Sequence, residues 1–196
     1  MKLNEHPPGA TPLDQDDIDQ LKLKYITTLE ELNRWEQENI SFALDWLARR
    51  RNKKEVLNEE FILKLHEKMF GKVWGWAGKF RRSEKNIGVP WVNVPVAVRT
   101  LVDDAKAWIE FNSFTHDEIA SRFHHQLVLI HPFSNGNGRH SREITDALLK
   151  DVLGRDVFTW GSGNLIDKGE VRERYIAALK AADQNNYQPL LHFVRS

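Results

Sequence analysis

The residues best suited to chemistry in this chain lie in one stretch, called here the anion loop, which reads His131-Pro132-Phe133-Ser134-Asn135-Gly136-Asn137-Gly138-Arg139-His140-Ser141-Arg142. Two glycines spaced two apart let the backbone take positive φ angles and turn several N–H groups toward one ligand. The loop leads into the N-terminus of a predicted helix, where free N–H groups and the positive dipole end favour an anion. We therefore predict a phosphate-binding loop.

Two arginines and a histidine complete this candidate site. Arg139 and Arg142 are three positions apart, so both guanidinium groups can reach one anion from the same helix face. No acid lies between Glu118 and Glu143 to neutralise them locally. His131 ends the preceding predicted helix and can act as a general base. A plain helix–helix turn would explain each feature alone, but their combination favours a phosphate site, and the Gly-Lys-Ser/Thr ending of a Walker loop is absent.

Helical patterns surround the anion loop. Thr11 followed by Pro12 predicts an early helix with Thr11 as its N-cap. Thr115 and Glu118 form a capping box, and Gly154 is placed to end a helix. Apolar residues recur at helical spacing in segments 29–49, 61–69, 101–109, 120–130, 144–152 and 171–182.

Residues 86–98 depart from this helical pattern. Gly88, Pro90 and Pro95 lie among β-branched residues, which predicts a short β-hairpin or extended flap. The fold class is therefore all-α with one small β excursion. We expect one globular domain, in which an N-terminal segment, 1–56, packs on a core, 57–196.

Composition narrows the function further. The chain has 28 basic and 28 acidic residues, which argues against a binder that holds nucleic acid by a basic field. It has no cysteine, which excludes disulfides, thiolate zinc sites and thiol nucleophiles. No apolar run is long enough for a membrane span, and residues 1–19 lack a signal core, so we expect a cytoplasmic protein without membrane or nucleic-acid partners.

The anion loop resembles the signature of the Fic (filamentation induced by cAMP) family, His-x-Phe-x-Asp/Glu-Gly-Asn-Gly-Arg-x-x-Arg. Residues 74–81, Trp-Gly-Trp-Ala-Gly-Lys-Phe-Arg, are similar to the family's Trp-Ala-Gly-x-x-Arg segment. The resemblance covers residues 30–196 and is strongest to the small Fic proteins called mobile mystery protein B. It implies an all-α, Fic-fold helical bundle with a short β-hairpin flap.

The resemblance implies transfer of AMP from ATP to a Ser, Thr or Tyr hydroxyl of a target protein. His131 would take the hydroxyl proton, and Phe133 would anchor the loop in the core. Catalysis would also involve Asn137 and Arg142. The nucleotide would be bound by Gly136, Asn137, Gly138, Arg139 and Arg142, with Asn164 and Tyr175 near its base. The target would dock on a flap of Asn86, Ile87, Gly88 and Val89.

Asn135 departs from the family signature, because it stands where the family has an acid that binds Mg²⁺. An amide oxygen can ligate a hard cation but brings no negative charge. We therefore expect ATP as co-substrate and a weakened Mg²⁺ site at Asn135.

The predicted helix 29–49 carries a candidate inhibitor. Glu38 interrupts an aromatic stripe, and a buried acid needs a partner. Glu38 and Asn39 match the end of the family's inhibitory pattern, Ser/Thr-x-x-x-Glu-Gly/Asn, although Arg34 replaces its Ser/Thr. The resemblance implies that Glu38 pairs with Arg142 and holds the enzyme off. The alternative is a solvated Glu38 at the border of the stripe.

Several alternatives remain open at this point. The same site could remove AMP or transfer another phosphate-containing group. From a different class, the chain could be a catalytically weak, nucleotide-binding regulatory module of a toxin–antitoxin-like pair. The target protein is not specified by the sequence, and neither a homodimer nor an antitoxin-like partner is decided by it.

Overall fold

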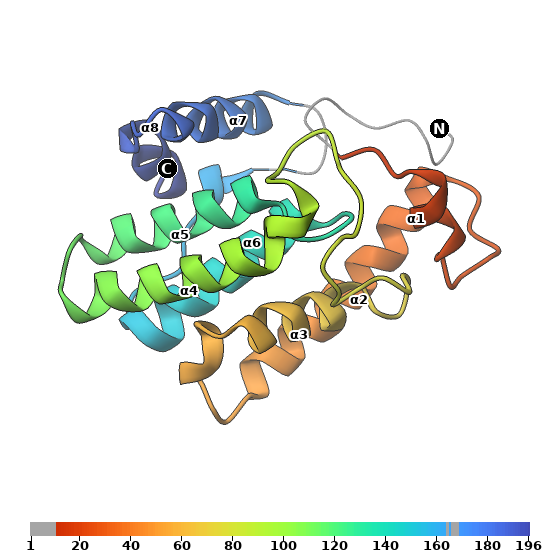
Figure 1. Cartoon of the computed structure of the whole chain (residues 1–196), viewed down its shortest axis with the longest axis horizontal. Coiled ribbons are helices and arrows are strands. Elements are labelled where there is room, and N and C mark those ends of the chain that lie inside the picture. The colour runs from red at the N-terminus through yellow and green to blue at the C-terminus, as the bar shows by residue number, and fades with distance from the viewer. Residues whose placement is uncertain (1–10, 164, 166–168) are drawn as a thin grey trace.

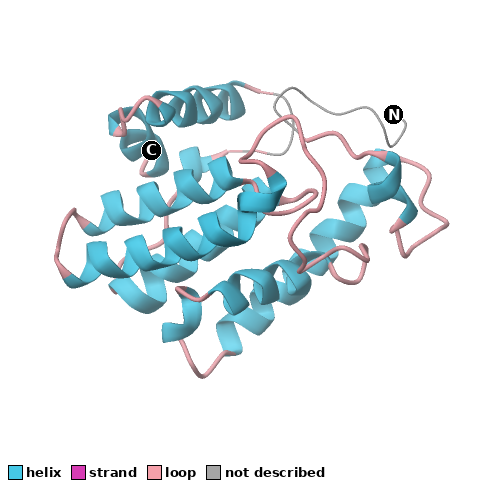
Figure 2. Cartoon of the chain, in the orientation of Figure 1, coloured by secondary structure: helices cyan, strands magenta, loops and turns pink. Residues whose placement is uncertain are grey.

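The computed structural model describes residues 11–163, 165 and 169–196, and these residues fold into a bundle of helices joined by loops (Figures 1 and 2). The β structure among these described residues is one isolated bridge between Leu21 and Trp74. The predicted all-α class is thus confirmed. Within the described residues, every helix is too short or too polar to cross a bilayer.

The helices are, in chain order, α1 (Gln15–Asp19), α2 (Leu29–Arg49), α3 (Glu59–Phe70), α4 (Val94–Glu110), α5 (His116–Ile130), α6 (Asn137–Ala147), α7 (Glu170–Asp183) and α8 (Gln188–Val194). Helix α5 packs against α4, α6 and α8, while α3 packs against both α2 and α6 (Figure 1). Short 3₁₀ turns occupy Lys54–Val56, Trp91–Asn93 and Trp160–Ser162, and a π-helical turn, Leu148–Leu153, continues α6. The anion loop therefore connects α5 to α6, two helices that each pack against at least two others.

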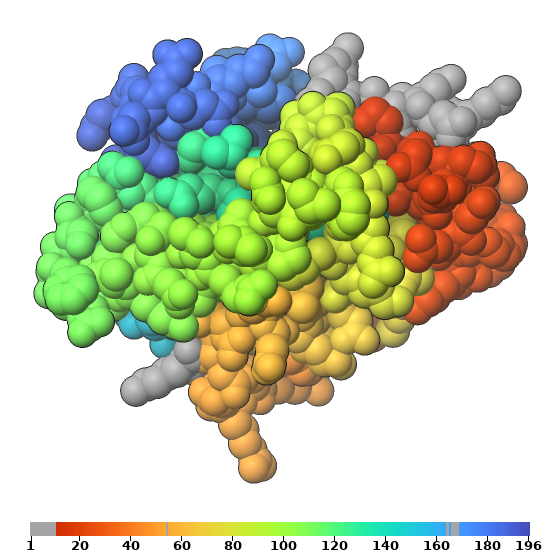
Figure 3. Space-filling view, viewed as in Figure 1, coloured from red at the N-terminus to blue at the C-terminus, as the bar shows by residue number. Residues whose placement is uncertain are grey.

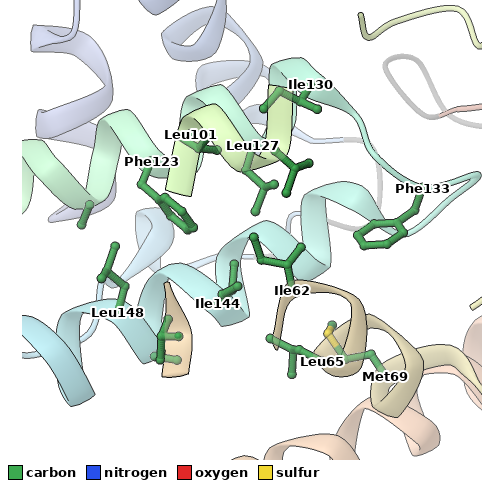
Figure 4. Close-up of a cluster of buried hydrophobic side chains, with 14 of the residues drawn as sticks. Ile62, Leu65, Met69, Leu101, Phe123, Leu127, Ile130, Phe133, Ile144 and Leu148 are labelled. Atoms are coloured by element: carbon green, nitrogen blue, oxygen red, sulfur yellow. The ribbon is translucent and has the colours of Figure 1, made fainter. Parts of the chain in front are cut away.

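The core is formed where α3, α4, α5 and α6 meet (Figure 4). Its fully buried side chains include Ile62, Leu65, Met69, Leu101, Phe123, Leu127, Ile144 and Leu148. Each such side chain contributes about 1.5–3 kcal/mol on leaving water. Phe133 extends this cluster into the anion loop, so the loop is fixed by the same core as the helices.

Helix boundaries follow the predicted capping residues in part. The Thr115 side chain accepts a hydrogen bond from the Glu118 N–H and begins α5. Gly154, in the left-handed region, ends the π-helical turn after α6. The predicted N-cap at Thr11 is wrong, because α1 begins at Gln15 with Asp14 as its cap. The Thr11 hydroxyl is thereby left available for another partner.

The predicted β-hairpin over residues 86–98 is also wrong. Residues 86–90 form an irregular loop, Trp91–Asn93 a 3₁₀ turn, and α4 begins at Val94. Pro95 lies in the first turn of α4. At this position a backbone N–H would have no partner within the helix, so proline loses no hydrogen bond there, and its fixed φ suits a helix. Of the β-branched residues after it, Val98 and Val102 lie on the buried face of that helix, whereas Val96 is exposed. Residues 86–89 are called the flap below.

Candidate active site

The backbone of the anion loop is shaped by two residues in the left-handed region. His131 ends α5 with φ 54° and ψ 62°, and Gly136 precedes α6 with φ 77°. The buried side chain of Asn137, the first residue of α6, accepts from the Phe133 N–H at 2.9 Å and donates to the Phe133 carbonyl at 2.8 Å. Asn137 thus closes the loop on itself, so its shape is set before any ligand binds.

Gly136 is required by two independent constraints. A left-handed φ is strained for any residue with a Cβ. In addition, a Cβ at this position would lie 2.6 Å from the ring of the buried Phe70. The start of α6 can therefore approach α3 this closely only through a glycine.

We expect Gly136→Ala to lower the free energy of unfolding by about 2–4 kcal/mol. Gly154→Ala is the matched control, because Gly154 has a similar φ of 62° but no atom within 4 Å of the added Cβ. Gly154→Ala should lower the free energy of unfolding only by the strain of a left-handed φ, about 1 kcal/mol. Urea unfolding of both variants measures the difference, and equal losses would show that the Phe70 ring does not constrain the loop.

Phe133 is buried against a histidine of α3. Its ring stacks on His66 with centroids 3.6 Å apart. His66 Nδ1 accepts from the Gly78 N–H at 3.0 Å, so Nε2 carries the proton and donates to the Asn135 carbonyl at 3.1 Å. Burial lowers the pKa of His66 well below its usual range and keeps the ring neutral. Sequence reasoning missed His66, which connects the 74–81 segment to the anion loop.

Arg81, at the end of the same segment, holds the loop and the flap together. Its buried guanidinium donates through Nε to the His131 carbonyl at 2.7 Å and through Nη2 to the Val89 carbonyl. The flap is so close that a Cβ on Gly88 would lie 2.8 Å from His131 Cβ. Asn86, Ile87 and Gly88 are exposed and Val89 is half-buried. The flap is therefore an open strip of backbone beside His131.

His131 is a buried, neutral base. Burial, with the positive charges of Arg81 and Lys85, lowers the pKa of His131 to about 4. Its Nε2 lies 2.7 Å from the Thr11 hydroxyl oxygen. A histidine that is uncharged at neutral pH has one nitrogen free to accept a proton, as a general base requires.

This shift predicts the pH dependence of the base. Because the folded-state pKa of about 4 lies below the usual 6.5, the neutral ring contributes stability that is present above pH 6.5 and is lost as the pH falls through 4. An NMR titration of the His131 ring should show its midpoint near pH 4. A midpoint near 6.5 would mean that the ring is solvated and the closed site is not the solution structure.

The two motif arginines have different surroundings. Arg139 Nη1 makes an ion pair of 2.7 Å with Glu36, and its guanidinium carbon lies 4.9 Å from the centre of the Phe70 ring. Arg142, three residues further along α6, is half-buried, and its Nη1 lies 3.8 Å from where a Cβ of Gly138 would be. Both therefore flank the start of α6, but Arg139 is already neutralised.

The acid that faces this site is Glu36 and not Glu38. Glu36 is 3% exposed, and its second oxygen accepts from the Trp74 indole N–H at 2.6 Å. Glu38 is exposed, and among the described residues no ion pair joins it to Arg142. Asn39 is buried but binds backbone atoms of Lys68 and Lys72, away from the loop. The predicted Glu38–Arg142 pair is wrong, because α2 turns a different face to the core.

Asn135 is turned back onto the protein. Its Oδ1 accepts from the Gly136 N–H at 2.6 Å, and its Nδ2 donates to the Thr11 carbonyl at 3.1 Å. Within the described part of the chain, no three His, Cys, Asp or Glu residues are grouped as metal ligands. The amide oxygen of Asn135 is engaged by a backbone N–H, and no described carboxylate lies beside it to bind a cation. These residues therefore do not fit a dedicated Mg²⁺ site.

From the sequence, Asn164 and Tyr175 are expected near the base of the nucleotide. Asn164 lies outside the described residues. Tyr175 is buried, its hydroxyl is 2.8 Å from His124 Nε2, and the Arg142 charge partly offsets the rise in its pKa that burial causes. Tyr175 is too enclosed to stack on a nucleotide base, and it packs in the core against His124.

Comparison with known proteins agrees with this site. The family model described as Fic/DOC family matches residues 56–149, which include the anion loop. "Protein adenylyltransferase Fic" from Aedes aegypti is 29% identical over 73% of this chain and 28% of its own length. The protein of the same name from Drosophila melanogaster is 31% identical over 68% of this chain and 26% of its own length. The chain thus spans about a quarter of these curated relatives.

Solved structures show the same architecture. Fic-1 from C. elegans has a TM-score of 0.62 and 24% identity, covering 86% of this chain and 48% of that one. BepC from Bartonella tribocorum, solved with bound AMPPNP, has a TM-score of 0.70 and 17% identity, covering 100% and 96%. Residues 56–149 therefore match the Fic/DOC family, and the chain has the all-α Fic fold. The closer resemblance to mobile mystery protein B stays a prediction.

Proposed function

We propose that this chain is a protein adenylyltransferase, which transfers AMP from ATP to a protein hydroxyl. The observation that carries the proposal is the neutral, buried His131, already 2.7 Å from a hydroxyl oxygen beside a phosphate-type loop. The names of the curated relatives and the nucleotide analogue in BepC point the same way.

In the proposed reaction, one side chain accepts a proton and other groups stabilise the charge on the phosphates. The acceptor hydroxyl gives its proton to His131 Nε2 while its oxygen forms a bond to the α-phosphorus. The bond from that phosphorus to the oxygen bridging to the β-phosphate breaks, and pyrophosphate leaves. N–H groups at the start of α6 and the Arg142 guanidinium stabilise the charge on the phosphates. Phosphoryl-type transfer needs this positioning and neutralisation more than covalent help from the protein.

The proposal includes an internal restraint on nucleotide binding. Glu36 neutralises Arg139 in a contact that is largely shielded from water, with the Glu36 side chain 4% exposed and that of Arg139 19% exposed. A triphosphate must displace this carboxylate before Arg139 can contact it. In this proposal, Glu36 therefore has the inhibitory role that the sequence predicts for Glu38.

The flap supplies the docking surface for a target in this proposal. Its exposed backbone lies beside His131, and Ile87 leaves 45% of its surface open to contact. An extended target segment could pair with such a backbone strip through main-chain hydrogen bonds. The target would then be selected by its shape at the flap and by a hydroxyl that reaches His131.

Parallel incubations with ATP labelled at the α- or the γ-phosphate test the function. Wild-type chain and Glu36→Gln are each incubated with both, and label on protein is counted. Label from the α-phosphate alone is expected. Label from the γ-phosphate alone would make the chain a kinase. Nucleotide binding with no label on any protein, from either variant, would favour a regulatory module.

A further inference from the structure

Thr11, although distant in sequence, lies in the place where an acceptor hydroxyl would be. Its side-chain oxygen is 2.7 Å from His131 Nε2, and the residue is 7% exposed. With the ring proton on Nδ1, Nε2 accepts the Thr11 O–H hydrogen bond. This is the contact that a general base makes with the hydroxyl it deprotonates.

The backbone around Thr11 is docked on the anion loop. The Thr11 carbonyl accepts from Asn135 Nδ2 at 3.1 Å, so the residue touches the loop on both sides of Phe133. Leu13, two residues on, is buried in the core. The contact with His131 is therefore one of several that fix residues 11–17, called here the docked segment.

An ion-pair clamp holds the other end of the docked segment beside the flap. Lys85 Nζ is 2.6 Å from a carboxylate oxygen of Asp14 and 2.6 Å from one of Asp17, with only 3% of the Lys85 side chain exposed. The space-filling view shows the red N-terminal segment directly beside the yellow-green flap (Figure 3). The docked segment thus runs along the side of the active site where a target would bind.

We propose that Thr11 is a self-modification site, which receives AMP from ATP within the same chain. The Thr11 oxygen forms the new bond to the α-phosphorus, its proton passes to His131 Nε2, and the bond to the pyrophosphate oxygen breaks. The products are a threonine–AMP phosphodiester and pyrophosphate. This inference rests on the proposed function and names one acceptor for it. While Thr11 occupies this place, it also excludes the hydroxyl of any other protein.

The Glu36→Gln chain, which keeps Thr11, and three variants made in that same background, so that nucleotide access is equal, test the inference. Thr11→Ser keeps the hydroxyl, Thr11→Val replaces it with a methyl group of similar size, and His131→Ala removes the base. Each is incubated with α-labelled ATP, digested, and mapped by mass spectrometry. We expect AMP on residue 11 of the Thr11 and Thr11→Ser chains, and at least tenfold less label on the Thr11→Val and His131→Ala chains.

The outcomes separate this inference from the function on which it rests. AMP found on other side chains or on an added protein, with Thr11 unmodified, would overturn the inference and leave the proposed function standing. No AMP on any protein would overturn both. Labelling of a second chain's Thr11 at a rate that rises with protein concentration would overturn transfer within one chain.

Discussion

Replacing His131 by alanine is expected to slow AMP transfer by about 10²–10⁴-fold, the usual contribution of a general base. ATP affinity should stay close to that of the wild-type chain, because the proposed nucleotide contacts come from N–H groups at the start of α6 and from arginine side chains. The rate of α-label incorporation and a calorimetric ATP titration measure the two effects separately.

His192→Ala is the matched control for that prediction. His192 lies exposed on α8, so its loss should change neither the rate nor ATP affinity. A His131→Ala chain that retains the full rate would remove His131 from the chemistry. A variant that loses ATP binding instead would assign the ring to the nucleotide site.

Replacing Glu36 by glutamine is expected to raise ATP affinity by about tenfold or more, since a hydrogen bond between charged groups contributes about 1.5–3 kcal/mol. Glutamine keeps an oxygen to accept from Trp74 but no longer neutralises Arg139, which then becomes free for the phosphates. Calorimetric titration with ATP measures the affinity, and the rate of α-label incorporation should rise with it.

Glu38→Gln is the control here, because it makes the same chemical change two residues away on the exposed face of α2. We expect it to leave ATP affinity unchanged. If Glu38→Gln raises the affinity and Glu36→Gln does not, the inhibitory role belongs to Glu38 and the ion pair with Arg139 is incidental.

The anion loop was predictable because its information is local. Glycine spacing, adjacent helix signals and two arginines one turn apart all lie within one short stretch, and the structure places them around the start of α6. The helices of the core were predictable for the same reason, since apolar spacing and caps act over a few residues. The β-hairpin prediction failed because Pro95 suits the first turn of a helix, and because the burial of Val94 and Val98 in α4 outweighs the weak strand preference of β-branched residues.

The sequence points to the wrong acid of α2 as the one that faces the anion loop, because two apolar stripes compete on this helix. The aromatic stripe through Trp35 and Phe42 suggested a buried Glu38, but these rings are 37% and 51% exposed. The buried face instead contains Leu32, Glu36, Asn39, Ile40 and Ala43. Leu32, Ile40 and Ala43 share that face by helical spacing, and Glu36 lies on it too. That signal is present in the sequence but is weaker than the aromatic one.

The contacts of Thr11 could not be predicted from the sequence, because they join residues about 120 positions apart. Local rules made Thr11 a helix cap, and Asp14 took that role instead. His66 and Lys85 were missed for a similar reason: a buried histidine or lysine acquires its role only from partners that the fold brings to it.

Phosphorus NMR of the Glu36→Gln chain mixed with ATP tests most directly the claim that this site transfers AMP. We expect the ATP signals to be replaced by pyrophosphate and by a phosphodiester signal that stays with the protein, and we expect the additional His131→Ala change to slow the appearance of both by about 10²–10⁴-fold. ADP with inorganic phosphate, or an ATP spectrum that does not change, would contradict it.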